Sequence, residues 1–185
     1  SRRNPVVAHY QINNKNYPRD HWIHSPEGGG VILGHGCHVI DLFCHLLDAK
    51  IEKVQVNRIA DGVEEYHSQD NALLNISFND GSIVNVLNTT MGNKKVPKEH
   101  CQIFCDGLVL SMDDYKSTCI YGMEVNTGNI LLDKGYLKEL EVFARIVHEN
   151  VLNAMDIGSI IATTNILIDV ADGLKREKCF TVVAK

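Results

Sequence analysis

ALLNISFNDGSIVNVL, residues 72–87, is the stretch of sequence that decides the fold of this chain. Apolar and polar residues alternate on both sides of its centre, which is typical of two β-strands. The Asp-Gly step between them favours a tight turn, so the stretch predicts an antiparallel hairpin over 72–78 and 83–87. Leu74, Ile76 and Phe78 fall on one face. We assign Leu73, Val84 and Val86 to the other.

Further strands are expected on both sides of this hairpin. Alternation predicts one strand over 5–13 and another over 51–59. A second hairpin is expected over 101–104 and 108–111, so that residues 70–112 form adjacent antiparallel strands, and residues 180–183 fit an edge strand. Residues 14–30 are polar and rich in turn formers, so they predict a loop, and a loop of that length is usually functional.

Three helices complete the prediction. Apolar residues at helical spacing indicate helices over about 31–47 and 136–150, and Asp156 is a suitable N-cap for a last helix that ends near Arg176. Consecutive strands flanked by helices predict an α+β fold, with an open, mainly antiparallel sheet and helices packed on one face. A sheet that is apolar on both faces needs two covers, so we expect a second subunit on the other face.

Composition narrows the class of protein. The chain has 185 residues, of which 44% are apolar and 22% charged, and this composition fits one globular domain. The net charge of −5 gives no reason to expect nucleic acid or an anionic membrane as a partner. No apolar run was expected to reach the ~20 residues of a membrane helix, and residues 1–12 carry no secretory signal. The six cysteines are expected to be small buried residues of a reduced, cytoplasmic protein, with disulfides as the alternative.

The segment that follows the loop suggests chemistry. Three glycines, Gly28 to Gly30, let the backbone approach a ligand closely and turn sharply. The helix that begins after them carries His35 and His38, which share a face, and histidine suits proton transfer near neutral pH. Asp41 either accepts a hydrogen bond from one of them or solvates the helix. The alternative for His38 is a structural histidine on a helix face.

Residues beside the glycines fit a sugar site. A sugar packs its C–H face on an aromatic ring while its hydroxyl groups need hydrogen bonds. The candidate substrate-binding residues are Tyr10, His21, Trp22, His24, Gly29, Gly30 and Asp41. An alternative role for Trp22 is to anchor the loop in the core.

A metal site is the other chemistry to weigh here. His35, Cys37, His38 and Cys44 are close in sequence, and histidine and cysteine are zinc ligands. Their spacing matches no closed site, and neighbouring helix residues point about 100° apart. We therefore expect no metal.

Two stretches together resemble a known family. Residues 20–30, DHWIHSPEGGG, and residues 36–42, GCHVIDL, are similar to the C-terminal substrate domain of the glucose–fructose oxidoreductase / inositol dehydrogenase / MocA (Gfo/Idh/MocA) family. The similarity is greatest to its polysaccharide-biosynthesis branch. It extends to residues 10–13, 134–143 and 163–174, and so covers nearly the whole chain.

The resemblance implies the substrate-binding and oligomerisation part of an NAD(P)-dependent oxidoreductase that acts on a sugar, nucleotide sugar or polyol. It implies His38 as the catalytic acid–base residue and sheet-mediated homo-oligomers. The family has an aspartate where this chain has Gly34, and we expect His35 to replace part of its function.

No Gly-x-Gly-x-x-Gly motif follows a first strand, so the N-terminal dinucleotide-binding domain is expected to be absent from residues 1–185. NAD or NADP would then bind only in the full-length protein, and this fragment alone would be inactive. The alternative function is a non-catalytic carbohydrate-binding or oligomerisation module.

Overall fold

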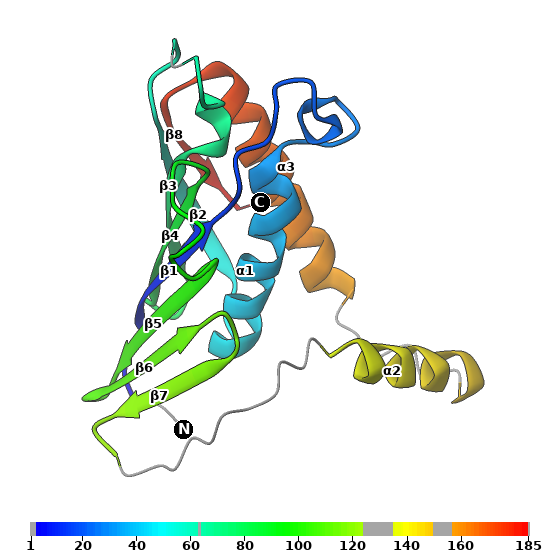
Figure 1. Cartoon of the computed structure of the whole chain (residues 1–185). Coiled ribbons are helices and arrows are strands. Elements are labelled where there is room, and N and C mark those ends of the chain that lie inside the picture. The colour runs from blue at the N-terminus through cyan, green and yellow to red at the C-terminus, as the bar shows by residue number, and fades with distance from the viewer. Residues whose placement is uncertain (1–2, 63, 124–134, 150–156, 185) are drawn as a thin grey trace.

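The computed structural model describes residues 3–62, 64–123, 135–149 and 157–184. Strands are labelled β, α-helices α and 3-10 helices η (Figure 1). In chain order the elements are β1 (Val7–Asn13), η1 (Trp22–His24), α1 (Val31–Leu47), β2 (Ile51–Arg58), η2 (Ser68–Asp70), β3 (Ala72–Phe78), β4 (Ile83–Thr89), β5 (Glu99–Cys105), β6 (Leu108–Asp113), β7 (Ser117–Tyr121), α2 (Tyr136–Glu149), α3 (Ile157–Arg176) and β8 (Cys179–Val183).

The strands form one open, eight-stranded sheet in the order β7-β6-β5-β1-β4-β3-β2-β8. Every neighbouring pair is antiparallel except β1 and β4, which run parallel. The predicted α+β class with a mainly antiparallel open sheet is confirmed. However, the two hairpins are not neighbours, because β1 lies between β4 and β5. The expectation of adjacent strands throughout residues 70–112 is therefore wrong at that point.

The β3–β4 hairpin forms as the sequence predicts, but the faces of its second strand differ from our assignment. Leu74 pairs with Val86 and Ile76 with Val84, so these four side chains share one face. All four are buried. Val84 and Val86 were assigned to the opposite face, and this was wrong because the register of pairing, which the alternation does not reveal, sets the face.

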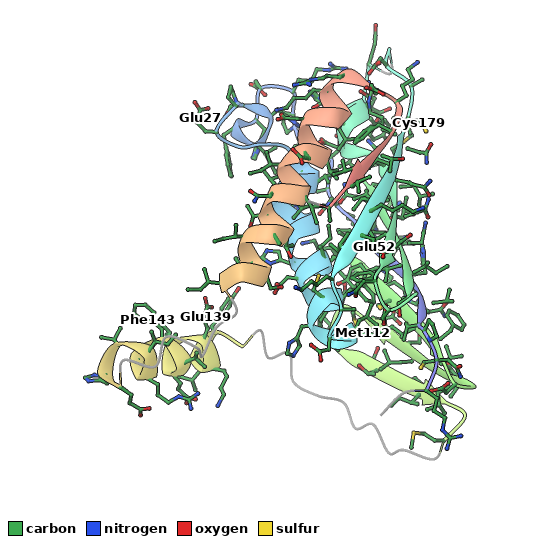
Figure 2. The ribbon with its side chains drawn as sticks, turned by 180° about the vertical axis from the view of Figure 1, so that it is seen from behind. Glu27, Glu52, Met112, Glu139, Phe143 and Cys179 are labelled. Carbon is green, nitrogen blue, oxygen red and sulfur yellow. The ribbon has the colours of Figure 1, made fainter. Side chains whose placement is uncertain are left out.

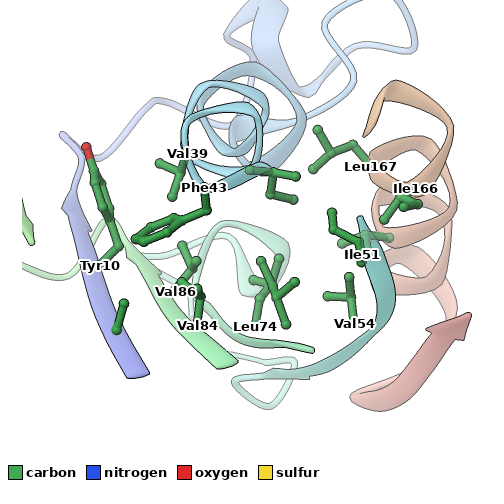
Figure 3. Packing of buried hydrophobic residues seen from close by; sticks show 14 of the residues in the cluster. Tyr10, Val39, Phe43, Ile51, Val54, Leu74, Val84, Val86, Ile166 and Leu167 are labelled. Carbon is green, nitrogen blue, oxygen red and sulfur yellow. The ribbon is translucent and has the colours of Figure 1, made fainter. Parts of the chain in front are cut away.

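Helices α1 and α3 cover one face of the sheet, and the core lies between these two layers (Figure 3). Phe43 from α1 and Leu167 from α3 are fully buried in it, with Tyr10, Val54 and Leu74 from the strands. The two helices approach closely at Gly36, where an added Cβ would lie 3.4 Å from Cδ2 of Leu167. This packing fixes α1 across β1 and the strands beside it.

Helix α3 is long and apolar enough to span a membrane by length and composition alone, with a mean hydropathy of 1.4 over its apolar window. Our expectation that no apolar run approaches that length was therefore wrong. One side of α3 packs in the core, through residues that include Ile166, Leu167, Val170 and Leu174. Burial of an apolar side against a sheet is the ordinary reason for such a composition in a globular domain.

The other face of the sheet carries no helix in the described part of the chain (Figure 1). An apolar row crosses its lower half, where Val7 and Ile83 are 51% exposed and Phe104 is 43% exposed. A polar row runs beside it, in which His9 Nδ1 lies 2.9 Å from Asn85 Oδ1 and Asn85 Nδ2 donates to Asn75 Oδ1 at 2.7 Å. We call this surface the open face.

Helix α2 forms as predicted, and its apolar side includes Leu140, Phe143 and Val147. None of its side chains is buried. It lies apart from the sheet and from the other two helices, as Phe143 shows in Figure 2. The proposed N-cap Asp156 lies outside the described residues.

Strand β7 was not predicted. Asp114 and Tyr115, which join β6 to β7, both adopt positive φ. Glycine and asparagine are the residues that usually mark such a turn in a sequence. Neither is present at this turn, and this is why β7 was missed.

The cysteines differ in part from the expectation. All six are free, and Cys101 is buried, which raises the pKa of its thiol to about 12. Cys119 and Cys179 are exposed rather than buried, because each lies on the outward side of an edge strand.

Candidate functional site

A glycine turn joins η1 to α1 and orients the start of the helix. Ile23 is buried and anchors η1, and its carbonyl accepts a hydrogen bond from the Gly30 amide at 2.8 Å. Gly29 and Gly30 have φ values of 70° and 94°. A Cβ on Gly28 would lie 2.3 Å from the Trp22 carbonyl oxygen. These positions favour glycine, and the amides of Gly28, Gly29 and Gly30 all donate hydrogen bonds within the turn, which fixes its shape.

Helix α1 presents a polar stripe to solvent. Gly34, His38, Asp41 and His45 are all exposed and recur at helical spacing, opposite the buried side that carries Val39 and Phe43. Gly34 has open space around the position of its missing Cβ. His38 is therefore accessible to a molecule that arrives from outside this domain.

His35 lies at the border between this stripe and the sheet, and it is half-buried. Its Nδ1 lies 3.2 Å from the Val31 carbonyl oxygen. A carbonyl can only accept, so Nδ1 carries the hydrogen and Nε2 is left as an acceptor in the neutral ring. Burial lowers the pKa of His35, and the positive charge of Lys98 lowers it further, while the Val31 carbonyl and Glu99 oppose this shift.

Beneath α1, Tyr10 is completely buried. Its hydroxyl donates to the Glu99 carboxylate and lies 2.8 Å from the Tyr115 hydroxyl, and its ring meets Phe43 edge-on at 6.2 Å. Burial raises the pKa of Tyr10, and the hydrogen bonds to Glu99 and Tyr115 raise it further. Tyr10 is thus part of the core beneath α1 and holds Glu99, whose charge raises the pKa of His35.

Asn13 holds the loop between β4 and β5, which carries Lys98 and ends at Glu99, the first residue of β5. Asn13 Nδ2 donates to the Asn93 carbonyl at 2.9 Å, and the Asn13 amide donates to the Lys98 carbonyl at 2.6 Å. A Cβ on Gly92 would lie 1.8 Å from Asn13 Oδ1, so the loop passes directly over this side chain. The lysines of this loop, Lys94, Lys95 and Lys98, are exposed.

The three candidates in the loop before the glycines, His21, Trp22 and His24, differ in their surroundings. Trp22 is 67% exposed, so its alternative role as a core anchor is wrong, and the smaller, fully apolar Ile23 takes that place. His21 Nδ1 accepts from the Ile23 amide at 3.2 Å. His24 turns inward, where its Nε2 lies 3.6 Å from Asp70 Oδ2.

The structure thus brings together His35, Tyr10, Glu99 and Lys98, with His38 beside them on α1. Trp22 begins η1 and His21 is its N-cap residue, at the other end of the glycine turn. Among the described residues, no hydrogen bond joins Asp41 to either histidine. Sequence patterns missed Glu99, Lys98 and Tyr115, because nothing in a local pattern shows that β5 and the β6–β7 turn lie beside β1. The same holds for Asp70 and His67, which meet His24 from a distant segment.

Neither a metal nor a dinucleotide has a set of ligands in the part of the chain that the structure describes. No three His, Cys, Asp or Glu side chains gather there as metal ligands. The glycine turn follows η1 and not a parallel strand, and β1 with β4 is the one parallel pair among the described strands. Its residues therefore do not form a dinucleotide cradle.

The fold and this site define a class: an α+β domain whose open sheet carries two helices on one face, one of which presents histidines behind a glycine turn. The chain belongs to the GFO/IDH/MocA family, whose C-terminal domain model matches residues 4–109. The resemblance seen in the sequence is confirmed.

Solved structures share the fold. An oxidoreductase from Thermotoga maritima has a TM-score of 0.70 and 19% identity, with 97% of this chain and 54% of that chain covered. The UDP-N-acetylglucosamine 3-dehydrogenase GnnA from Acidithiobacillus ferrooxidans has a TM-score of 0.67 and 17% identity, with 91% and 52% covered. An inositol dehydrogenase homolog from Azotobacter vinelandii, complexed with NADH and myo-inositol, has a TM-score of 0.65 and 13% identity, with 97% and 57% covered.

This chain spans about half the length of each of these structures. A search of curated proteins found no match to it.

Proposed function

We propose that this chain is the substrate-binding and oligomerisation part of an NAD(P)-dependent oxidoreductase that acts on a sugar, nucleotide sugar or polyol. The observation that carries the proposal is an accessible His38 beside a neutral, oriented His35, on a helix that begins at a glycine turn. Membership of the family and the fold shared with a nucleotide-sugar dehydrogenase support it. The dinucleotide would bind to a part of the protein outside this chain, where it would supply or accept the hydride.

In this proposal His38 transfers a proton and the other site residues orient the substrate. His38 would take the proton of the substrate hydroxyl group, or return it in the reverse direction, as a general base or acid. His35 would receive a hydrogen bond at Nε2 and orient the substrate, because its Nδ1 is held by Val31. His21, Trp22 and the backbone of Gly29 and Gly30 would contact the rest of the sugar.

A nucleotide sugar is the substrate that we favour within this class, as expected for the polysaccharide-biosynthesis branch. Lys94, Lys95 and Lys98 lie on one loop beside His35, and such cations suit a diphosphate. A cytoplasmic location belongs to the same proposal, and the six free cysteines support it.

Replacement of His38 by alanine in the intact enzyme tests the catalytic assignment. We expect turnover to fall by about 10²–10⁴, the usual contribution of a general acid–base group, with little change in the affinity for the cofactor. His45→Ala is the matched control, because His45 lies on the same exposed stripe two turns away. Turnover of His38→Ala within about threefold of the parent, well below that contribution, would refute the assignment.

We also propose that the open face is the surface through which subunits associate. Val7, Ile83 and Phe104 form an exposed apolar row there, and such rows mark interaction sites. Phe104→Asp should lower the oligomeric state measured by sedimentation. Leu46→Asp should not, because it makes the same kind of change at a 52% exposed residue of α1, on the opposite side of the domain. A parent protein that remains monomeric at high concentration would contradict the proposal.

Gly34 supports the alternative, a non-catalytic carbohydrate-binding or oligomerisation module, because the carboxylate of the family is missing. The space around Gly34 accepts a side chain. Gly34→Asp should raise the turnover of a catalytic protein or leave it intact, whereas a module shows no turnover with or without the aspartate. The gene of the parent protein separates the two as well, since a module needs no dinucleotide-binding domain.

A further inference from the structure

A buried cluster of charged and titratable groups lies at the N-terminus of α1, and the mechanism above does not use it. Asp70 from η2 is 1% exposed, and the side chain of His24 from η1 is 7% exposed. His24 Nε2 and both carboxylate oxygens of Asp70 are buried without a hydrogen-bond partner among the described residues. Burial of a carboxylate costs several kcal/mol unless other groups compensate its charge, so this arrangement needs a reason.

The start of α1 supplies part of that reason. The N-cap residue is Gly30, which has no side chain to accept hydrogen bonds from the amides of the first turn. The η2 segment that carries Asp70 packs against α1, and the positive end of the helix favours a negative charge there. Burial raises the pKa of Asp70, while His24 and the Val31 amide act in the opposite direction.

His24 is the ion-pair partner of Asp70, and His67 and Arg19 lie near this pair. His67 stacks on His24 with ring centroids 4.2 Å apart and planes at 12°. Burial lowers the pKa of His67, and the charges of His24 and Arg19 lower it further, so His67 is neutral near pH 7. The guanidinium of Arg19 donates to the Glu64 carbonyl at 3.1 and 3.3 Å. The described groups around the pair are therefore His67, Arg19 and the amide of Val31.

Val31 links this cluster to the candidate site. Its amide lowers the pKa of Asp70, and its carbonyl oxygen accepts the Nδ1 hydrogen of His35 at 3.2 Å. The glycine turn lies between His24, which precedes it, and Val31, which follows it. The attraction between His24 and Asp70 therefore holds the turn closed and fixes Val31, whose carbonyl orients His35.

We propose that the charge of Asp70 stabilises the N-terminus of α1, and that Asp70 with His24 forms a latch that holds the glycine turn and thereby positions His35 and His38. Asp70 and His24 are positioning residues: neither touches the substrate. The effect on turnover rests on the proposed function, whereas the effect on the backbone does not.

Amide hydrogen exchange in the intact protein, compared with turnover, tests the latch. Asp70→Asn keeps the size of the side chain and removes its charge. We expect exchange of the Gly30 and Val31 amides to accelerate about tenfold or more, with exchange in β3 and β4 unchanged, and turnover to fall while the KM for the cofactor stays the same. Glu65→Gln is the control, because it makes the same chemical change at an exposed carboxylate in the segment before η2.

A second variant and the pH dependence complete the test. His24→Gln should accelerate the same amides, and the double variant should be no worse than either single variant, because both remove one interaction. In the parent, exchange at Val31, corrected for its intrinsic rate, should slow as the pH rises through the raised pKa of Asp70 and its carboxylate becomes charged, and this change should vanish in Asp70→Asn.

Unchanged exchange at Gly30 and Val31 in both variants would overturn the latch. Accelerated exchange with unchanged turnover would support the latch and overturn its role in positioning His35 and His38, whereas the catalytic role of His38 is tested by His38→Ala.

Discussion

The two faces of the sheet come from the same strands and differ in what covers them. On the helix-covered face Tyr10, Leu74 and Val86 are at most 2% exposed. On the open face, Val7 pairs with Ile83 on one neighbouring strand and with Phe104 on the other. Each of these three side chains is about half exposed. The alternation of residues therefore makes two faces, but packing by α1 and α3 decides which of them is the core.

Two phenylalanines give the sharpest contrast between these surfaces. Phe43→Ala removes a fully buried ring that packs on Tyr10, and we expect the free energy of unfolding to fall by about 3–5 kcal/mol. Phe104→Ala, on the open face, should cost less than about 1 kcal/mol in a single subunit, as surface changes do. Urea unfolding at low protein concentration measures both. Equal losses would mean that the open face is covered within one subunit.

Two tyrosines extend the comparison to polar groups. Tyr10→Phe deletes the hydrogen bond to Glu99 beneath α1, and bonds to charged groups contribute about 1.5–3 kcal/mol, so we expect a loss in that range. Tyr121→Phe changes a side chain that is 59% exposed at the sheet edge and should alter stability by about 0.5 kcal/mol or less. A Tyr10→Phe variant as stable as the parent would show that Glu99 finds another donor.

The stability of the protein should depend on pH through two partly buried histidines. Burial lowers the pKa of His35 and His67 below the usual 6.5. The unfolded chain binds these protons more readily than the folded chain. Stability from this source is complete above pH 6.5 and is lost as the pH falls through the lower folded values.

Urea unfolding at pH 7.5 and 5.5 should show that loss, and His35→Gln should reduce it. Asp70 acts with the opposite sign, because its raised pKa removes stability as the pH rises above 3.8. A parent protein that is more stable at pH 5.5 than at pH 7.5 would contradict this assignment.

Two glycines of α1 provide the smallest contrast, with the same change on opposite sides of one helix. Gly34→Ala adds a methyl group to open space and should stabilise the protein by about 0.5–1 kcal/mol, the difference in helix propensity. Gly36→Ala should gain less, because its methyl group would lie 3.4 Å from Leu167 in the layer between the helices. Thermal unfolding compares them, and an equal gain would mean that α1 and α3 can separate slightly at no cost.

The sequence by itself determined the local elements, the family and most of the candidate residues. Alternation and turn signals located β1 to β6 and β8, helical periodicity located α1 and α2, and the glycines with His35 and His38 remain the candidate site. These features depend on neighbours within a few residues, and such neighbours set backbone conformation directly.

Only the tertiary structure decided which residues meet. The insertion of β1 between β4 and β5 brings Glu99 and Lys98 to Tyr10 and His35, and the position of η2 brings Asp70 to His24 and the start of α1. It also put Val84 and Val86 on the covered face, turned Trp22 outward and left the apolar side of α2 without a buried residue. Register and strand order depend on pairing between segments far apart in the chain, so a local pattern shows that a face is apolar or that a histidine is present, but not what lies opposite to it.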